Sequence, residues 1–368
     1  MKIAILGTRG IPNHYGGFEQ FAEYLSIGLA QRGHDVTVYN GHTHPYQEPE
    51  FQGVKIKHIY DPENKVGTAG QFIYDMLCIL DTRKNDFDII LQLGYTSSSV
   101  FFDLHPKKSI VVTNMDGLEW KRTKYSLKVQ KFLQWAESLA TKKSDFLISD
   151  SIGIQNYLKN KYNKKSVYIP YGSYVVNSFD ESTCKEYGVE KYNYDMLIAR
   201  LEPENSIEII LDGVACSSVK RKFLVIGKHE TRYGEYLKDK FKNETNIIFV
   251  GGVYNQSKLD DLRCFSNIYF HGHTVGGTNP SLLEAMGSKA LICANKNEFN
   301  SAILGDDALY FHSIKEVKNV IETMKKDDYS EYIKNNIKKI KELYEWDTII
   351  NQYEVFLFKC IKNNQRYL

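Results

Sequence analysis

The sequence has few of the features that mark membrane-spanning, disulfide-bonded or strongly charged proteins. None of its 368 residues belongs to an apolar run of about 18 residues, and the apolar part of the amino terminus, MKIAILGTRG, is too short for a signal peptide. Six scattered cysteines without a CxxC pair argue against a zinc site or disulfide framework and favour reduced thiols in a cytoplasmic protein. A formal charge of +2 and the lack of a recognition motif argue against nucleic-acid binding.

Two sequence signatures of other enzyme classes are missing as well. The first predicted βα turn, GTRGIP at residues 7–12, is not a GxGxxG fingerprint, and the next strand ends in Tyr39 and Asn40 without an acidic residue, which disfavours a nicotinamide dehydrogenase. No DxD motif lies in a suitable loop, because Asp81, Asp86 and Asp88 are interpreted as turn residues before a strand. We therefore expect a protein that uses no metal and no cofactor.

The length and composition indicate two globular domains. The chain is 42% hydrophobic and 25% charged, and 368 residues fit two domains of about 150–200 residues each. A Pro-Tyr-Gly breaker segment follows residue 169, so we expect an amino-terminal domain at 1–172 and a second domain at 173–346, followed by a carboxyl-terminal helix at 347–368.

Short apolar runs alternate with amphipathic stretches, which is typical of parallel sheets covered by helices. Strands are predicted at residues 2–6, 36–39, 54–58, 89–93, 110–113, 146–149 and 167–169, then at 195–199, 223–226, 247–250, 268–270, 290–294 and 308–311. Helices are predicted at residues 18–31, 207–217, 257–265 and 280–287, and from 331 onward with a break near Trp346. This order favours an α/β protein of two doubly wound halves that face each other with a ligand between them.

Two glycine-rich segments follow predicted strands. In the first, Gly16 and Gly17 open a helix, where free amides attract phosphate; the alternative is a loop that only needs positive φ angles. In the second, HGHTVGGTNPSLLEAMG at residues 271–287, a helix opens at Pro280, so the amides of residues 277–279 would face an anion at the positive end of a helix dipole.

Glu284 lies one turn inside that second helix, where its carboxylate could accept hydrogen bonds from sugar hydroxyls. The alternative is an exposed helix residue. His271 and His273, two positions apart and without a third ligand nearby, make a poor metal site and could be satisfied loop residues.

These blocks carry a resemblance to a known family. The run GGTNPSLLEAMG (276–287) resembles the donor-binding segment of family 4 glycosyltransferases, which have the GT-B fold, and GTRGIPNHYGGFEQFAEYLSIGLAQRGHDVTVY (7–39) is similar to their opening. More narrowly, both resemble the branch of bacterial rhamnosyltransferases of polysaccharide assembly, as do DGLEWKR (116–122), ARLEPEN (199–205) and IPYG (169–172). Matching blocks span residues 1–346, nearly the whole chain. The resemblance implies two Rossmann-like domains that face a central cleft, with the carboxyl-terminal helix at 347–368 packing back on the first domain.

The resemblance also implies roles for individual residues. Arg200 would contact the donor diphosphate, and Glu284 would hold the ribose. The other donor-binding residues that it implies are Gly16 and Gly17 beside the diphosphate or sugar, Val253 and Tyr254 beside the nucleobase, and Gly276, Gly277, Thr278 and Asn279 around the transferred sugar and β-phosphate.

Two positions depart from the family pattern. Gly276 stands where many members have a glutamate, which weakens a glucose or N-acetylglucosamine donor and suits a differently oriented or deoxy sugar. Asn205 stands where many have a lysine, and Lys228 or Arg9 could supply the missing charge at the leaving group. Both departures are usual in the rhamnosyltransferase-like branch.

The implied chemistry is transfer with retention at the anomeric carbon. Arg200 and the helix-terminal amides would stabilise the departing diphosphate. Asp116 would orient or deprotonate an acceptor hydroxyl; equally, it could be a helix N-cap or a loop residue. Glu119, Lys121 and Arg122 would contact the acceptor sugar or pyrophosphate, with a solvated charged face as the alternative.

Positive charge is concentrated in residues 101–170, which carry thirteen Lys or Arg against six Asp or Glu. Aromatic residues, among them Trp120 and Trp135, are interleaved with it. Such a surface can sit against anionic lipid, consistent with an acceptor on a lipid pyrophosphate at the inner membrane face; the alternative is a solvated helix face.

We therefore predict a metal-independent, retaining glycosyltransferase that moves L-rhamnose from dTDP-rhamnose onto a lipid-linked or polysaccharide glycan. The alternative within the class is a UDP-hexose donor. A sugar-nucleotide epimerase, against which Gly276 argues, and a non-catalytic glycan-binding subunit stay open as other classes.

Overall fold

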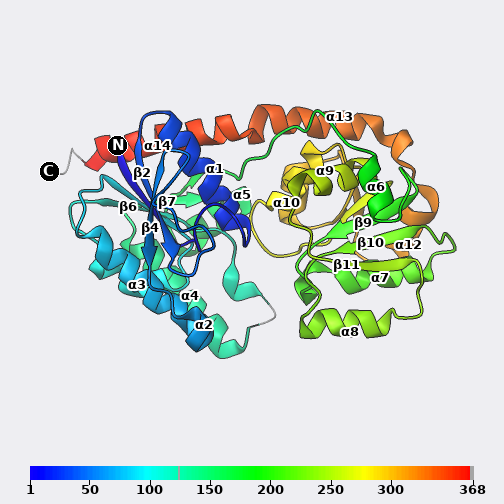
Figure 1. Ribbon diagram of the computed structural model, residues 1–368, viewed down its shortest axis with the longest axis horizontal. Coiled ribbons are helices and arrows are strands. Elements are labelled where there is room, and N and C mark those ends of the chain that lie inside the picture. Colours follow the sequence, from blue (N-terminus) through cyan, green and yellow to red (C-terminus); the bar gives the residue numbers. More distant parts are fainter. Residues whose placement is uncertain (123–124, 365–368) are drawn as a thin grey trace. The chain divides into compact units, whose positions relative to one another are not determined.

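The computed structural model describes residues 1–122 and 125–364. Thr123 and Lys124 of the basic segment and residues 365–368 of the expected terminal helix lie outside the described residues. The described chain divides into two compact units (Figure 1). Unit 1 comprises residues 1–120, 125–171 and 346–364, and unit 2 comprises residues 121–122 and 172–345.

Unit 1 alternates strands and helices. Its strands are β1 (Lys2–Leu6), β2 (Asp35–Gly41), β3 (Glu50–Phe51), β4 (Val54–Ile59), β5 (Ile89–Leu93), β6 (Ile110–Asn114), β7 (Phe146–Ser149) and β8 (Val167–Tyr168). Its α-helices are α1 (Gly17–Gln31), α2 (Glu63–Val66), α3 (Gly70–Thr82), α4 (Leu127–Lys143), α5 (Ile152–Tyr162) and α14 (Trp346–Asn364), with short turns of 3-10 helix at η1 (Gly67–Ala69), η2 (Ser98–Leu104) and η3 (Glu119–Lys121).

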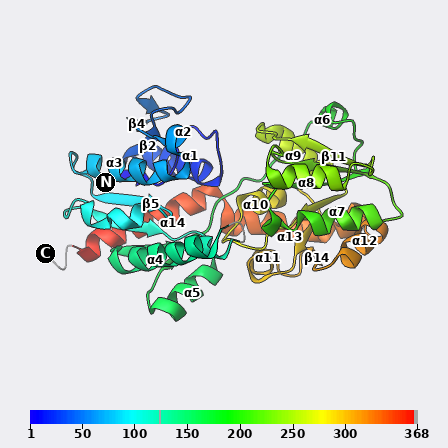
Figure 2. The same ribbon diagram turned by 90° about the horizontal axis from the view of Figure 1, so that it is seen from below.

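Within the described residues, these strands form one eight-stranded sheet in the order β3-β4-β2-β1-β5-β6-β7-β8. Every pairing is parallel except that of β3 with β4. All five residues of β5 and of β6 are buried, as expected for central strands that have helices on both faces (Figure 2).

The last helix of the chain packs in unit 1, where α14 lies beside α1 (Figure 1). Gly28 of α1 allows close approach, because a Cβ there would lie 2.3 Å from Cδ1 of Ile350. Ile349, Tyr353 and Leu357 of α14 are fully buried, and the Tyr353 hydroxyl accepts a 3.2 Å hydrogen bond from the Asn114 amide. Unit 1 thus completes its core with residues that follow the whole of unit 2 in sequence.

Unit 2 repeats the pattern. Its strands are β9 (Tyr194–Ile198), β10 (Lys222–Ile226), β11 (Ile247–Gly251), β12 (Ile268–His271), β13 (Ile292–Asn295) and β14 (Leu309–Phe311). Its helices are α6 (Ser182–Glu186), η4 (Pro203–Asn205), α7 (Ile207–Cys216), α8 (Arg232–Lys240), α9 (Gln256–Phe265), α10 (Pro280–Gly287), α11 (Glu298–Leu304), α12 (Ile314–Thr323), η5 (Lys326–Tyr329), α13 (Ser330–Lys339) and η6 (Ile340–Tyr344).

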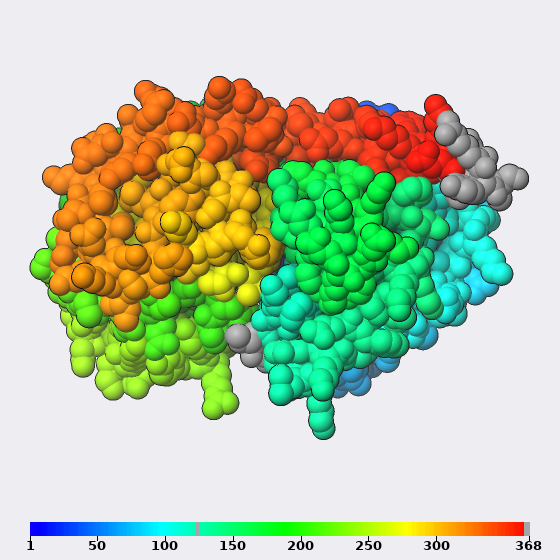
Figure 3. Space-filling model, turned by 180° about the vertical axis from the view of Figure 1, so that it is seen from behind, coloured from blue at the N-terminus to red at the C-terminus, as the bar shows by residue number. Residues whose placement is uncertain are grey.

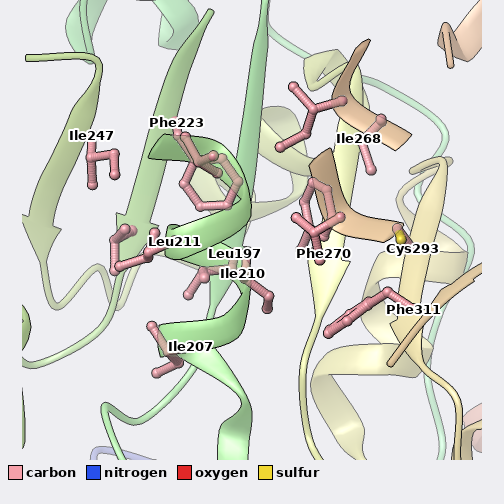
Figure 4. Close-up of a cluster of buried hydrophobic side chains, with 14 of the residues drawn as sticks. Leu197, Ile207, Ile210, Leu211, Phe223, Ile247, Ile268, Phe270, Cys293 and Phe311 are labelled. Carbon is pink, nitrogen blue, oxygen red and sulfur yellow. The ribbon is translucent and has the colours of Figure 1, made fainter. Parts of the chain in front are cut away.

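In the described part of unit 2, the sheet has six parallel strands in the order β11-β10-β9-β12-β13-β14. Leu197, Phe223, Phe270 and Phe311 project from four of these strands into a core shared with α7, whose Ile210 is also fully buried (Figure 4). Burying side chains of this size stabilises the fold by about 1.5–3 kcal/mol each, which makes the sheet a rigid support for the loops at its edges.

The predicted α/β class with two parallel-sheet domains is confirmed, and every strand predicted from the sequence is present within two residues of its expected ends. The interpretation of Asp81 as a turn residue was wrong, because it belongs to α3 and accepts hydrogen bonds from the Tyr39 hydroxyl at 3.1 Å and Lys57 Nζ at 3.0 Å. Among the described residues, no helix has the length and apolar character that crossing a bilayer requires.

Candidate functional site

The candidate site of unit 2 is built at the carboxyl edge of its sheet. Strands β11, β10, β9 and β12 are parallel neighbours in that order, so the segments that follow them emerge from one edge. Arg200 follows β9, Lys228 follows β10, Tyr254 follows β11 and the glycine loop follows β12. In doubly wound sheets, this edge is where ligands bind. The structure thus brings most of the predicted donor-binding residues to one edge.

Arg200 has an exposed side chain on a fixed backbone. Its carbonyl oxygen accepts hydrogen bonds from the Asn205 side-chain amide at 2.7 Å and from the Glu202 N–H at 2.8 Å. Asn205 is buried, so its side chain acts here on the backbone of Arg200. The side chain of Arg200 is held at the edge of the sheet and remains accessible to a ligand.

Positive charge gathers around His273, in the loop after β12. Burial lowers the pKa of His273 most, and together with the positive charges of Arg200 and Arg122 it brings this pKa to about 3. Its ring stacks on that of His271, with centroids 4.5 Å apart and planes at 19°. Burial also holds the pKa of His271 well below its usual range. Both imidazoles are therefore neutral at physiological pH, and the fixed positive charge comes from the arginines.

The glycine loop is anchored on two sides. The Thr274 N–H and hydroxyl donate to the carbonyl oxygen of Glu204 at 3.2 and 2.7 Å, and the side-chain amides of Asn297 and Asn300 donate to the carbonyl oxygen of His273 at 3.0 and 3.1 Å. Gly272 is needed for close approach, because a Cβ would lie 2.0 Å from the Asn205 carbonyl oxygen. The loop therefore has a defined position before α10 begins.

Gly276 has a φ angle of +141°, which side chains rarely adopt. Within the described chain, no atom lies within 4 Å of where its Cβ would be. Gly276 thus leaves open space at the position where the resemblance noted above implies a glutamate in many members. Gly277 is half-buried and Thr278 is buried.

The amino terminus of α10 is capped by its own sequence. Oδ1 of Asn279 accepts hydrogen bonds from the Ser281 N–H at 3.0 Å and the Ser281 hydroxyl at 2.9 Å. The side chain of Asn279 therefore satisfies the helix terminus, which leaves anion binding at this helix to backbone groups.

Glu284 is held by an arginine that sequence analysis missed. Nη2 of Arg263, on α9, donates to Oε2 of Glu284 at 2.5 Å, and Nη1 of Arg263 donates to Oδ1 of Asp260 at 3.0 Å. Only 1% of the Arg263 side chain is exposed, and 16% of Glu284. The sequence offered one signal for this buried arginine: it stands between Leu262 and Cys264 on an amphipathic helix, and all three residues are buried.

Three further predicted donor residues of unit 2 lie in the segments that follow β10 and β11. Lys228 is exposed after β10. Val253 is half-buried after β11, whereas Tyr254 is 79% exposed. The structure therefore places both segments at the carboxyl edge of the sheet.

In unit 1, the turn after β1 is also tightly constrained. Glu19 is buried in the first turn of α1 and accepts hydrogen bonds from the Thr8 hydroxyl at 3.2 Å and the Arg9 N–H at 2.9 Å. Gly16 is the N-cap of α1 and Gly17 its first residue. The Arg9 guanidinium pairs with Glu63, at 2.6 Å from Oε1. Arg9, a predicted substitute for the missing lysine, is therefore engaged by a carboxylate of unit 1.

The predicted acceptor residues follow β6. Asp116 is a half-buried loop residue with a φ angle of +40°, and its N–H donates to Oδ1 of Asn114 at 3.1 Å. Glu119 and Lys121 bound the short helix η3. Arg122 lies 3.8 Å from the carboxylate of Glu204 within unit 2. Of the two alternatives to a catalytic role for Asp116, the structure matches the loop residue and not the N-cap.

No group of three or more His, Cys, Asp or Glu side chains among the described residues is arranged to hold a metal ion. Two exposed side chains, Arg200 and Lys228, carry positive charge at the carboxyl edge of unit 2.

Comparisons with known proteins identify the fold. A family model described as a domain of unknown function (DUF1972) matches residues 1–174. The chain is 22% identical over 393 residues to the uncharacterized glycosyltransferase MJ1069 of Methanocaldococcus jannaschii, covering 96% of this chain and 97% of the relative.

Solved structures match over almost the whole chain. Sucrose-phosphate synthase from Thermosynechococcus elongatus has a TM-score of 0.79 at 14% identity, covering 98% of this chain and 99% of that one. HepE from Anabaena in complex with UDP has a TM-score of 0.75 at 16% identity, covering 98% and 100%. The fold is therefore the GT-B type, with two Rossmann-like parallel-sheet units.

Proposed function

We propose that this chain is a glycosyltransferase whose second unit binds a nucleotide sugar. The observation that carries the proposal is that Arg200, the glycine loop and Glu284 all lie at the carboxyl edge of one parallel sheet. The archaeal relative is named a glycosyltransferase, and HepE was solved with UDP and with UDP-glucose, which supports a nucleotide-sugar donor.

The proposed reaction transfers the sugar with retention. The bond between the anomeric carbon and the β-phosphate oxygen breaks, and the nucleoside diphosphate leaves with negative charge. Arg200 and the backbone groups at the start of α10 stabilise that charge, so the proposal requires no metal ion. The acceptor oxygen bonds to the anomeric carbon on the face that the phosphate leaves, and its proton passes to the phosphate oxygen. Asp116 orients the acceptor hydroxyl, and Glu119, Lys121 and Arg122 contact the acceptor glycan or its pyrophosphate.

The proposed donor is dTDP-L-rhamnose. Gly276 removes the carboxylate with which many family members bind donor-sugar hydroxyls, and the open space at its Cβ position leaves nothing to replace it. A 6-deoxy sugar in another orientation is compatible with this loss. The second candidate is a UDP-hexose, which the likeness to HepE bound to UDP-glucose favours.

The test is a thermal-shift panel of dTDP-rhamnose, UDP-glucose and GDP-mannose, followed by transfer assays. We expect dTDP-rhamnose to raise the melting temperature most; a larger shift with UDP-glucose would select the second candidate, and no shift with any donor would overturn the proposal. Arg200→Ala should lower kcat by about 10²–10³-fold. Arg232→Ala, at an exposed arginine of α8, is the matched control and should keep full activity.

The proposed acceptor is lipid-linked, and α4 is the proposed contact with the membrane surface at its inner face. Leu127 and Trp135 are 75% and 50% exposed, and with the exposed Lys131 they recur every four residues on one side of the helix. Figure 3 shows α4 and α5 at the surface of unit 1. A basic helix with exposed apolar side chains suits anionic lipid.

Sedimentation with anionic and with neutral vesicles tests this part. Binding should require anionic lipid and fall in Leu127→Ser/Trp135→Ser. Val167→Ser, at an apolar side chain of β8 that is 40% exposed, should bind as the wild type does. Equal binding by all three proteins would contradict the assignment of α4.

A further inference from the structure

Arg263 is a buried charge to which the sequence analysis assigned no role. It lies on α9 and is fully buried, with its guanidinium 6.0 Å from the centroid of the Tyr269 ring. Placing a guanidinium in such an environment is costly unless carboxylates and hydrogen bonds compensate it. The contacts of the Arg263 guanidinium therefore indicate its role.

Two carboxylates share this guanidinium. Nη2 donates to Oε2 of Glu284 at 2.5 Å, and Nη1 donates to Oδ1 of Asp260 at 3.0 Å. The same oxygen of Asp260 accepts hydrogen bonds from the Ser288 hydroxyl at 2.8 Å and the Gln256 side-chain amide at 2.9 Å. Arg263 is thus fixed from α9 and from the end of α10, while its other end holds Glu284 on α10.

The ion pair between Arg263 and Glu284 fixes the orientation of the Glu284 carboxylate, and the stability of the fold alone does not require such a pair. Replacing a buried ion pair by apolar residues is often neutral or stabilising, so such pairs are weak arguments for stability. The planar guanidinium, by contrast, fixes the direction of a carboxylate that it contacts.

We propose that Arg263 is a positioning residue for nucleotide binding: it holds the carboxylate of Glu284 in one orientation, so that Glu284 accepts hydrogen bonds from the hydroxyl groups of the nucleotide's pentose. This inference rests on the proposed function, in which Glu284 contacts the ribose of the donor. Arg263 itself does not touch the nucleotide. Its effect is specific to the hydroxyls of the pentose.

The experiment compares two ligands that differ only in the hydroxyls of the pentose. Calorimetry measures the Kd of the nucleoside diphosphate selected by the donor panel and of its analogue without those hydroxyls. If the panel selects dTDP, the analogue lacks the 3′-hydroxyl, the only free hydroxyl of its pentose; if it selects UDP, the analogue lacks both the 2′- and the 3′-hydroxyl. We expect the wild type to prefer the hydroxylated ligand by about 10- to 100-fold, the range for hydrogen bonds to charged groups. Arg263→Lys, which keeps the charge but loses the planar fork, should reduce this preference to less than about threefold. The donor KM should rise and kcat should change less.

Arg221→Lys is the matched control. Arg221 donates to the buried carboxylate of Asp195 at 3.0 Å, just before β10 and at the opposite edge of the sheet. It should lower stability while the hydroxyl preference stays at the wild-type value. If Arg263→Lys fails to fold, Arg263→Gln serves in its place, with all titrations made well below the melting transition of each protein.

The outcomes separate this inference from the function on which it rests. A wild type that binds no nucleoside diphosphate overturns both. A wild type that binds dTDP or UDP without preferring the hydroxylated form overturns the role of Arg263 and leaves the glycosyltransferase proposal standing. An unchanged preference in folded Arg263→Lys or Arg263→Gln shows that Arg263 is only structural and overturns the inference.

Discussion

The ammonium group of Lys161 lies 2.9 Å from Oε1 of Glu137, a carboxylate that is 1% exposed. The hydroxyls of Tyr157 and Tyr162 donate to the same oxygen at 2.7 and 2.6 Å, and the Trp120 indole donates to Oε2 at 3.1 Å. One carboxylate on α4 thereby ties α5 and the segment after β6 to the same point of unit 1. Asp116 and Glu119, two of the acceptor residues proposed above, belong to that segment.

Glu137→Gln should lower the free energy of unfolding by about 2–3 kcal/mol, because it leaves Lys161 without its counter-charge and turns one acceptor oxygen into a donor. Urea unfolding followed by tryptophan fluorescence measures this. Lys128→Met, at an exposed lysine of the same helix, should change stability by less than about 0.5 kcal/mol. A loss below about 1 kcal/mol in Glu137→Gln would show that the network does not stabilise unit 1.

Gly28→Ala tests the packing of α14 on α1. The new Cβ would lie 2.3 Å from Cδ1 of Ile350, and overpacking of this kind costs about 1–3 kcal/mol. Ile350→Val removes that Cδ1 and costs about 0.5–1.5 kcal/mol alone. The double variant should be more stable than the sum of the two changes predicts. If the two changes in the free energy of unfolding simply add, the new Cβ at position 28 does not clash with Ile350, and the prediction is wrong.

His105 predicts sensitivity to acid. It is buried after η2, neither ring nitrogen has a hydrogen-bond partner among the described residues, and burial lowers its pKa to about 4. Because the unfolded state binds a proton near pH 6.5 and the folded state near 4, stability is full above pH 6.5 and is lost as the pH falls between these values.

His105→Leu should remove that loss. Between pH 7.5 and 4, we expect the wild type to lose about 3 kcal/mol relative to the variant, a figure that follows from the difference between the two pKa values. Urea unfolding across this range provides the curve. Parallel pH profiles of the two proteins would refute a buried neutral imidazole.

Asn205→Ala tests whether this residue supports Arg200. The variant loses the 2.7 Å hydrogen bond to the Arg200 carbonyl oxygen, worth about 1 kcal/mol net. We expect kcat/KM for the donor to fall by about fivefold to tenfold, with Arg200→Ala masking the effect in the double variant. Asn193→Ala removes an amide of unit 2 that donates to Glu190 at the protein surface, and it should be silent.

Much of the fold and part of the site could be predicted from the sequence. The strand, the glycine loop and the helix that begins at Pro280 were all predicted, and the bounds of the helix were predicted to the residue, because Pro and Gly mark these boundaries directly. The side chains that contact the site residues could not be predicted. Arg263 reaches Glu284 across 21 positions and Arg9 reaches Glu63 across 54, and local patterns carry no signal for such long-range pairs.

Unit 1 draws its last helix from the final residues of the chain, after all of unit 2 has been encoded. A ribosome makes the chain from the amino terminus, so residues 1–171 emerge long before the helix that covers them. Unit 2 is nearly continuous in sequence, and all of its residues precede that helix. Residues 1–171 produced alone would lack the side chains of Ile349, Tyr353 and Leu357, which are buried in the core of unit 1.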